Sequence, residues 1–385
     1  MITRLRVRAF TAADAGAVAA LHARAYAERS WPSEAARAAY FRELLLHNPW
    51  ADAEMPSWVA EDEAGIAGFM GVMTRRMRFA ARPIRVAVAC QLMVDPGRPT
   101  GFAALELMRR YFAGPQDLSV ADGANDAARR CWEACGGLAS PLHTLHWVRL
   151  LRPARGLLHL AGGRALNLLG GPFAALADAC LRFGPQVKSG LREEPLEAAG
   201  LTEVLQRLRS AFALRPDYDV WDLEWLLGQA RAKRRHGELH GALLRDRGGR
   251  AAGWFLYYLN GAVSKVLSVG GGRSELPGVL EALFEHARAR GAAALEGRLE
   301  PHVAPALKGK RCLLQNRGIS TLLHSRDPAL LVPFLRGDAL FTRLEGEWWT
   351  RFNGEPAPAA LPKKPRELPQ KPPAARKRKV ALTPF

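Results

Sequence analysis

The feature that most constrains this chain is a strand, a short loop and a helix in immediate succession between residues 86 and 112. Residues 86–94 are apolar and rich in β-branched side chains, which is typical of a buried strand. The loop after them contains Gly101, and residues 104–112 have the pattern of an amphipathic helix. Free N–H groups and the dipole at such a helix N-terminus favour an anion, and Arg98 adds positive charge. The segment therefore predicts an α/β fold with a phosphate-binding loop.

The spacing Arg98-x-x-Gly101-x-Ala103 resembles the acyl-CoA signature of the GNAT N-acyltransferase superfamily. In that superfamily the loop binds the pyrophosphate of an acyl-CoA, and main-chain N–H groups of the preceding strand hold the thioester. The resemblance thus implies acetyl-CoA or another acyl-CoA as co-substrate. The cofactor-binding residues that it implies are Leu92, Met93, Val94, Arg98, Pro99, Thr100, Gly101, Phe102, Ala103 and Asn125. Taken alone, the spacing also fits an ordinary strand-to-helix turn in another α/β fold.

The order of elements expected in residues 1–150 extends the resemblance. A strand near the N-terminus precedes a capping-box pattern at residues 11–14, and Ser33 is a candidate cap for a second helix. Strands are expected at residues 57–62 and 66–74, before the strand that leads to the loop. The run from Asn125 onward resembles the superfamily's second motif, on the helix after the fifth strand.

Three departures from the superfamily pattern affect the expected catalytic groups. Trp132 stands where a tyrosine usually serves as general acid, and its indole N–H cannot act as an acid near neutral pH. Gly137 replaces a common aromatic residue, and the loop is one residue shorter between Pro96 and Arg98. The candidate catalytic residues are Cys131 and Tyr111 as acids and Glu61 as base, with Glu54 and Asp62 as further bases. The alternatives are a buried thiol for Cys131, core packing for Tyr111 and a surface position for the carboxylates.

A chain of 385 residues is long enough for two domains, and the second half repeats the order of the first. Residues 270–273 form a glycine loop before a helix, but the Arg-x-x-Gly-x-Ala spacing is absent and Pro277 interrupts the start. We expect a GNAT-like domain at 1–150, a helical linker at 151–194, a second, degenerate GNAT-like domain at 195–353 and a tail at 354–385. Each domain should hold a mixed central sheet flanked by helices. An unrelated α/β domain is the alternative for the second half.

Charge and cysteine content limit the partners and the compartment. The tail is rich in Pro, Lys and Arg and is expected to be disordered, as a contact for nucleic acid or an anionic surface or as a solubilising extension. The net charge of +18 also suits an acyl-CoA. The 5 cysteines form no disulfide framework and no zinc spacing, and no stretch is apolar enough for a membrane span. We therefore expect a cytoplasmic protein without a metal; the oligomeric state stays open.

Three functions compete at this level. The first is an acyl-CoA-dependent N-acyltransferase that acts on an amine of a small molecule or amino sugar. The second is a non-catalytic acyl-CoA-binding or regulatory protein, which Trp132 keeps open. The third is a FemAB-like aminoacyl transferase that uses aminoacyl-tRNA, for which the basic surplus would bind RNA. Arg98 and its loop favour the first two, because a phosphate site at that position is an acyl-CoA trait.

Overall fold

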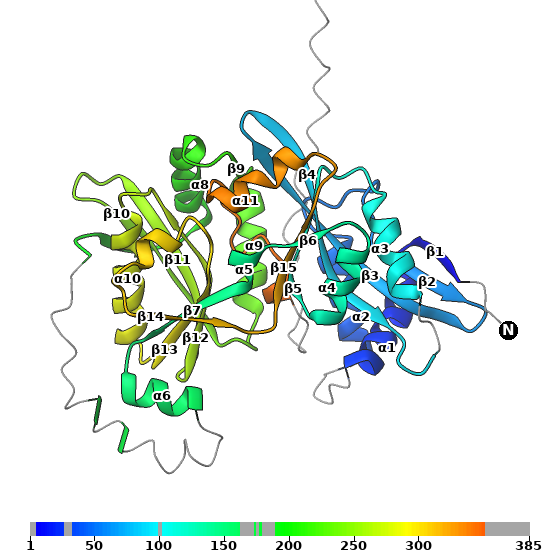
Figure 1. Ribbon diagram of the computed structural model, residues 1–385, viewed down its shortest axis with the longest axis horizontal. Coiled ribbons are helices and arrows are strands. Elements are labelled where there is room, and N and C mark those ends of the chain that lie inside the picture. The colour runs from blue at the N-terminus through cyan, green and yellow to red at the C-terminus, as the bar shows by residue number, and fades with distance from the viewer. Residues whose placement is uncertain are drawn as a thin grey trace, which may run out of the picture.

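The computed structural model describes residues 5–26, 33–98, 102–161, 173–174, 177–178 and 189–350. The expected loop residues Pro99, Thr100 and Gly101, part of the linker and the whole 354–385 tail lie outside the described residues. The described chain forms two mixed sheets with helices on their faces, side by side in Figure 1. The expected α/β class with two modules is confirmed.

The first half of the chain builds most of one sheet and its helices. Its elements are β1 (Arg6–Ala9), η1 (Ala12–Asp14), α1 (Ala15–Tyr26), α2 (Glu34–Leu45), β2 (Trp58–Asp62), β3 (Gly65–Phe79), β4 (Arg82–Val94), α3 (Ala103–Phe112), β5 (Leu118–Ala124), α4 (Asp126–Ala134), β6 (Leu138–Ala139) and α5 (Pro141–Thr144). Cap residues set several of these helix starts. The Ser33 side chain accepts the N–H of Ala36, and the Asn125 side chain accepts the N–H of Ala128.

The second half follows the same plan with different connections. Its elements are β7 (Leu145–Leu150), α6 (Pro153–Ala161), β8 (Arg192–Pro195), α8 (Ala198–Arg207), η2 (Leu208–Ser210), β9 (Leu214–Pro216), α9 (Val220–Ala232), β10 (Glu238–Arg245), β11 (Ala251–Leu259), β12 (Val263–Gly271), α10 (Leu276–Ala289), β13 (Ala294–Arg298), η3 (Ala304–Leu307), β14 (Cys312–Asn316), β15 (Ser320–His324), η4 (Pro328–Leu330), α11 (Val332–Arg336) and η5 (Trp348–Thr350). None of the helices among the described residues is long and apolar enough to cross a membrane.

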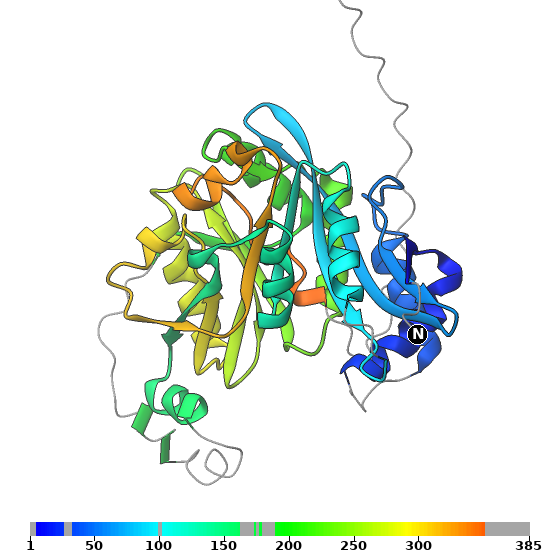
Figure 2. The ribbon, with the colours of Figure 1, turned by 45° about the vertical axis from the view of Figure 1, so that its right-hand side comes forward.

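The two sheets exchange a strand. The first sheet has the order β1-β2-β3-β4-β5-β15-β6, with β9 also paired to β3, and the second has the order β14-β7-β13-β12-β11-β10-β8. Strand β7 therefore lies between β13 and β14, while β15 lies between β5 and β6. Figures 1 and 2 both show the orange β15 beside the cyan strands. Each sheet thus includes a strand from the other half of the chain, an arrangement that no local sequence signal indicates because strand pairing here is long-range.

The modules also share a hydrophobic core. One cluster of buried residues combines Phe69 and Val88 of the first sheet with Leu226, Trp254 and Leu267 of the second half. A second cluster lies under α10, and a third lies under α3 and α4. The two modules therefore pack against each other through buried apolar surface.

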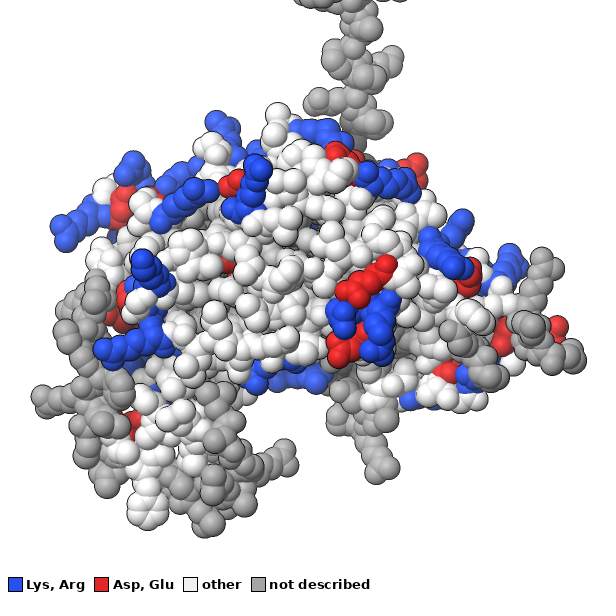
Figure 3. Space-filling view, in the orientation of Figure 1, with Lys and Arg blue, Asp and Glu red and all other residues white. Residues whose placement is uncertain are grey.

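The net positive charge is distributed unevenly over the surface. On the face shown in Figure 3, most Lys and Arg side chains lie around the rim, a mixed group of basic and acidic side chains lies to the right of the centre, and much of the central area is uncharged. Among the described residues, Leu313 and Leu314 of β14 are exposed apolar side chains. This face therefore offers no basic track for a nucleic acid at its centre.

Candidate active site in the first module

A cavity opens where two parallel strands of the first sheet separate. Strands β4 and β5 pair over three positions, residues 86–88 against 118–120, and then diverge. Beyond Val88 the pairings of β4 among the described residues are with β3, on its other side. The cavity between the diverging strands measures about 240 Å³. Its walls come from β4, β5, the first turns of α3, and α4.

A bulge shapes the β4 wall. Cys90 pairs with Gly71 and Met93 pairs with Phe69, so β4 holds one residue more than β3 between these positions. Gln91 lies in the bulge with φ of 54°, a left-handed conformation that is costly for a residue with a side chain. Its buried Oε1 accepts a hydrogen bond from Nε2 of His22 at 3.1 Å, which helps to hold the bulge. The bulge bends the main chain of β4 at the cavity wall.

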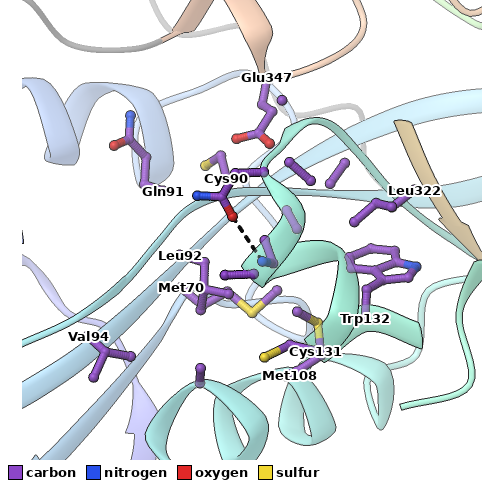
Figure 4. Close-up of a pocket in the computed structure, with 18 of the residues that line it drawn as sticks. Met70, Cys90, Gln91, Leu92, Val94, Met108, Cys131, Trp132, Leu322 and Glu347 are labelled. Atoms are coloured by element: carbon purple, nitrogen blue, oxygen red, sulfur yellow. Dashed lines mark hydrogen bonds between the residues drawn. The ribbon is translucent and has the colours of Figure 1, made fainter. Parts of the chain in front are cut away.

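The cavity lining is mainly apolar and rich in sulfur. Figure 4 shows Met70, Met108 and Cys131 together on one side, with Trp132 beside them. Small side chains on β5 and α4 leave the space between these groups; they are Ala121, Ala124, Ala127 and Ala128. Such a lining suits an apolar or uncharged group better than a highly charged one.

One acidic side chain enters this lining from the far end of the chain. Glu347 follows α11 and lies next to η5, yet its carboxylate projects into the cavity from above in Figure 4, near Cys90. A Cβ built on Gly123 of β5 would lie 3.2 Å from its Oε1, so the absence of a side chain there leaves room for it. Burial raises the pKa of the Cys90 thiol well above its ordinary value, with Glu347 adding to the rise, so that thiol stays neutral.

The expected acids occupy different environments. Cys131 lines the cavity. Tyr111 is buried and is not among the lining residues; its hydroxyl donates to the Ala87 carbonyl at 2.7 Å, and burial raises its pKa far above the ordinary value. Trp132 lines the cavity, but its indole N–H donates to the Leu323 carbonyl of β15 at 3.0 Å. Cys131 and Trp132 both line the cavity, but the indole N–H of Trp132 is held by a main-chain carbonyl. Of the three described side chains, Cys131 is therefore the one that can present a proton donor to the cavity.

The expected base Glu61 lies elsewhere. Its carboxylate accepts from Nη2 of Arg8 at 2.7 Å on the outer strands of the sheet, and it is not among the cavity-lining residues. Arg98 is also held by protein groups. Its Nη1 donates to Asp62 at 3.0 Å and its Nη2 to the Ala64 carbonyl at 2.9 Å, so it fastens the start of the loop to the β2–β3 turn.

The other expected cofactor residues divide by position. Leu92 and Val94 line the cavity, whereas the side chain of Met93 lies in the shared core, as alternation along a strand requires. Asn125 lines the cavity and caps α4. Phe102, at the N-cap position of α3, is 76% exposed, and Ala103 is buried.

Sequence reasoning missed Glu347, the one carboxylate among the cavity-lining residues that the structure describes. No short-range pattern marks it, since it lies more than 200 residues from the strands that form the cavity. Only the path of the chain between the two modules brings it there.

Comparisons with known proteins establish the fold. No protein-family model and no curated protein sequence matches this chain. A probable N-acyltransferase from Enterococcus faecalis V583 is similar in structure, with a TM-score of 0.54 and 11% identity over 84% of this chain and 72% of that one. A GCN5-related N-acetyltransferase from Kribbella flavida is also similar, with a TM-score of 0.52 and 14% identity over 86% of this chain and 74% of that one. Another, from Anabaena variabilis ATCC 29413, has a TM-score of 0.56 and 10% identity over 84% of this chain and 73% of that one. These likenesses in structure show that the chain has the fold of the GCN5-related N-acetyltransferases.

Proposed function

We propose that the protein is an acyl-CoA-dependent N-acyltransferase that acts on an amine of a small molecule or amino sugar. The observation that carries the proposal is the Glu347 carboxylate inside the cavity between β4 and β5. A base beside a cleft of this shape is what acyl transfer to an amine needs, because the amine must lose a proton to attack. The similar structures described as N-acetyltransferases support the proposal.

Residues of β4, α3 and α4 are suited to binding the donor. We assign the main-chain N–H groups of residues 92–94 to the thioester carbonyl and the pantetheine arm, which would add along the free side of β4 like another strand. The N-terminal turn of α3, with Phe102 and Ala103, is assigned to the diphosphate together with the adjoining residues 98–101. Asn125 contributes to the opposite wall.

Glu347 and Cys131 are assigned to proton transfer. Glu347, directly or through a water, takes a proton from the amine as its nitrogen bonds to the thioester carbon. The carbon–sulfur bond then breaks, and the electron pair leaves with the CoA sulfur. A thiolate is a stable leaving group, since an ordinary thiol has a pKa of about 8.5. Cys131 is the candidate to return a proton to it, as it lies on the cavity wall.

A non-catalytic acyl-CoA-binding protein is the second candidate. It is favoured by the hydrogen bonds that occupy Tyr111 and Trp132, which leave neither side chain as a proton donor. The two functions share the same binding site and differ in turnover alone. The FemAB-like alternative finds no basic track at the centre of the face in Figure 3.

Calorimetry followed by a thiol-release assay tests the proposal. We expect acetyl-CoA to bind with a stoichiometry of one and tRNA not to compete. Release of CoA thiol should depend on one class within a panel of primary amines that includes alkylamines, polyamines and amino sugars. Binding of acetyl-CoA without turnover of any amine would favour the second candidate, and binding of tRNA alone would refute both.

The variant Glu347→Gln separates the base from the binding site. We expect it to lower kcat by about 10²-fold, the lower end of the range for a general base, with little change in acetyl-CoA affinity. The matched control is Glu133→Gln, because Glu133 is a carboxylate on the outer surface of α4, paired with Arg129. It should leave both quantities unchanged.

A further inference from the structure

The two modules contain the same diverging pair of parallel strands and fill it differently. In the second module β12 and β13 pair over three positions, residues 263–265 against 294–296, as β4 and β5 do in the first. There the chain's own 339–350 segment contacts both strands. Thr342 Oγ1 donates to Ser268 Oγ of β12 at 3.0 Å, and Arg298 of β13 donates to the Phe341 carbonyl at 2.6 Å. The segment therefore packs against both strands of the second pair, beside a cavity of about 380 Å³ that is lined by the start of α10, His302 and η3.

The same segment continues into the first module, where one buried carboxylate holds it. The side chain of Asp122, on β5, has 0% exposure. Its Oδ1 accepts the main-chain N–H groups of Glu347 at 2.5 Å and of Trp348 at 2.9 Å. Two charge-assisted bonds to successive N–H groups fix the backbone that carries the Glu347 side chain. They cap η5 in the way that an N-cap residue satisfies the first N–H groups of a helix.

Asp122 is in turn paired with the second module. Its Oδ2 accepts from Nη1 of Arg298 at 3.1 Å, and the Arg298 side chain is 2% exposed. Removing either partner from such a pair leaves an uncompensated charge out of water, so the two depend on each other. Because Arg298 also bonds to Phe341, three parts of the molecule meet at one point: the first sheet, the second sheet and the 339–350 segment.

We propose that Asp122 and Arg298 are positioning residues that hold Glu347 in the first cleft. The second module would then position the base of the first module. It does so because β12 and β13 bind the 339–350 segment, which carries Glu347. The inference rests on the proposed function, since it takes Glu347 as the base. It predicts that a change at the contact between modules alters proton transfer without altering donor binding.

The test compares Asp122→Asn in the full chain with and without Glu347→Gln. Alone, Asp122→Asn should lower kcat by about 10-fold to 10²-fold through displacement of the base, with an unchanged KM for acetyl-CoA. The acidic limb of the pH–kcat profile should move or disappear as well. In the Glu347→Gln background the same substitution should cause no further loss, because the group it positions is already absent. An equal loss in both backgrounds would overturn the proposal and leave Asp122 a structural role.

Hydrogen exchange provides a readout that needs no acceptor. The amides of Glu347 and Trp348 should exchange at least 10-fold faster in Asp122→Asn than in the parent, while those of the second sheet should not change. Unchanged exchange would refute the anchoring. If Asp122→Asn does not fold, Arg298→Lys, which keeps the buried charge, takes its place with the same criteria. Full activity of Glu347→Gln alone would instead refute the base assigned under the proposed function.

Discussion

Nη1 of Arg98 donates to the Asp62 carboxylate at 3.0 Å, which joins the start of the expected phosphate loop to the end of β2. The Arg98 guanidinium also reaches the Ala64 carbonyl and lies 3.6 Å from Asp95. The arginine that the sequence predicts to bind a diphosphate is thus also held by Asp62, Ala64 and Asp95. Its positive charge should matter both for the proposed binding of the diphosphate and for these contacts.

Reversing the charge of Arg98 should weaken donor binding. In Arg98→Glu a carboxylate faces Asp62 and Asp95 and repels the diphosphate, so we expect the Kd for acetyl-CoA to rise at least 10-fold, about 1.4 kcal/mol. Isothermal calorimetry measures the change. Arg109→Glu, on the exposed side of α3, is the control for net charge. An unchanged Kd in Arg98→Glu would rule out diphosphate binding at this loop.

Removing the Tyr111 hydroxyl should affect stability and not turnover. The hydroxyl donates to the Ala87 carbonyl of β4 and is buried, so Tyr111→Phe should cost about 1 kcal/mol of unfolding free energy. We expect kcat to stay the same, because the residue does not line the cavity. Denaturant unfolding and the thiol-release assay measure the two effects. A large fall in kcat without loss of stability would restore Tyr111 as the acid.

Gly137 should not tolerate a side chain. A Cβ there would collide with the indole ring of Trp132, which fills the space beside it. We expect Gly137→Ala to destabilise the protein by about 1–3 kcal/mol, the usual cost of overpacking. The control Gly228→Ala lies within α9, where an added Cβ meets no atom within 4 Å, and should instead stabilise by about 0.5–1 kcal/mol. Thermal melts measure the change in melting temperature of each variant. Changes of the same sign in the two variants would contradict this explanation.

Stability should fall between pH 6.5 and pH 4 through buried histidines. Burial lowers the pKa of His302 to about 4, of His286 to about 4 and of His236 to about 3. Below the unfolded pKa of 6.5 the unfolded state binds these protons more readily than the folded state, so acid favours unfolding. For His302, whose side chain is 4% exposed, the loss at pH 5 should be on the order of 1–2 kcal/mol.

The control for this pH effect is a histidine on the surface. The difference between the melting temperatures at pH 7.5 and pH 5 should be smaller in His302→Gln than in the parent. His47→Gln, at a side chain that is 57% exposed, should leave the difference as it was. If His302→Gln keeps the full difference, the titration of that side chain does not contribute.

The local features of the fold were predictable, because their causes lie within a few residues. The hairpin turn at Asn260 and Gly261 separates β11 from β12, and the aromatic strand β11 is buried in the sheet. Alternation, capping residues and glycine positions act through neighbours in the chain, and a single sequence contains all of this information. The same holds for strand β4 and helix α3, which line the cavity.

The candidate site was predictable in part. Leu92, Val94 and Asn125, which the resemblance implied as cofactor-binding residues, and the candidate acid Cys131 line the cavity. Tyr111 and Glu61 do not, because the face that each side chain takes depends on packing against other elements. The Tyr111 side chain packs against the sheet and its hydroxyl donates to the Ala87 carbonyl. The Glu61 carboxylate accepts a hydrogen bond from Arg8 on the neighbouring strand.

By itself, the sequence determined the class of fold, the repeat of the plan in two halves and the strand and helix that build one wall of the site. Tertiary structure alone decided the exchange of β7 and β15 and the arrival of Glu347 beside β4 and β5. The physical reason is that these interactions are long-range. The buried pair of Asp122 and Arg298 joins residues 176 positions apart. The energy of such a contact depends on the distance between the two groups in the folded chain, which no local pattern encodes.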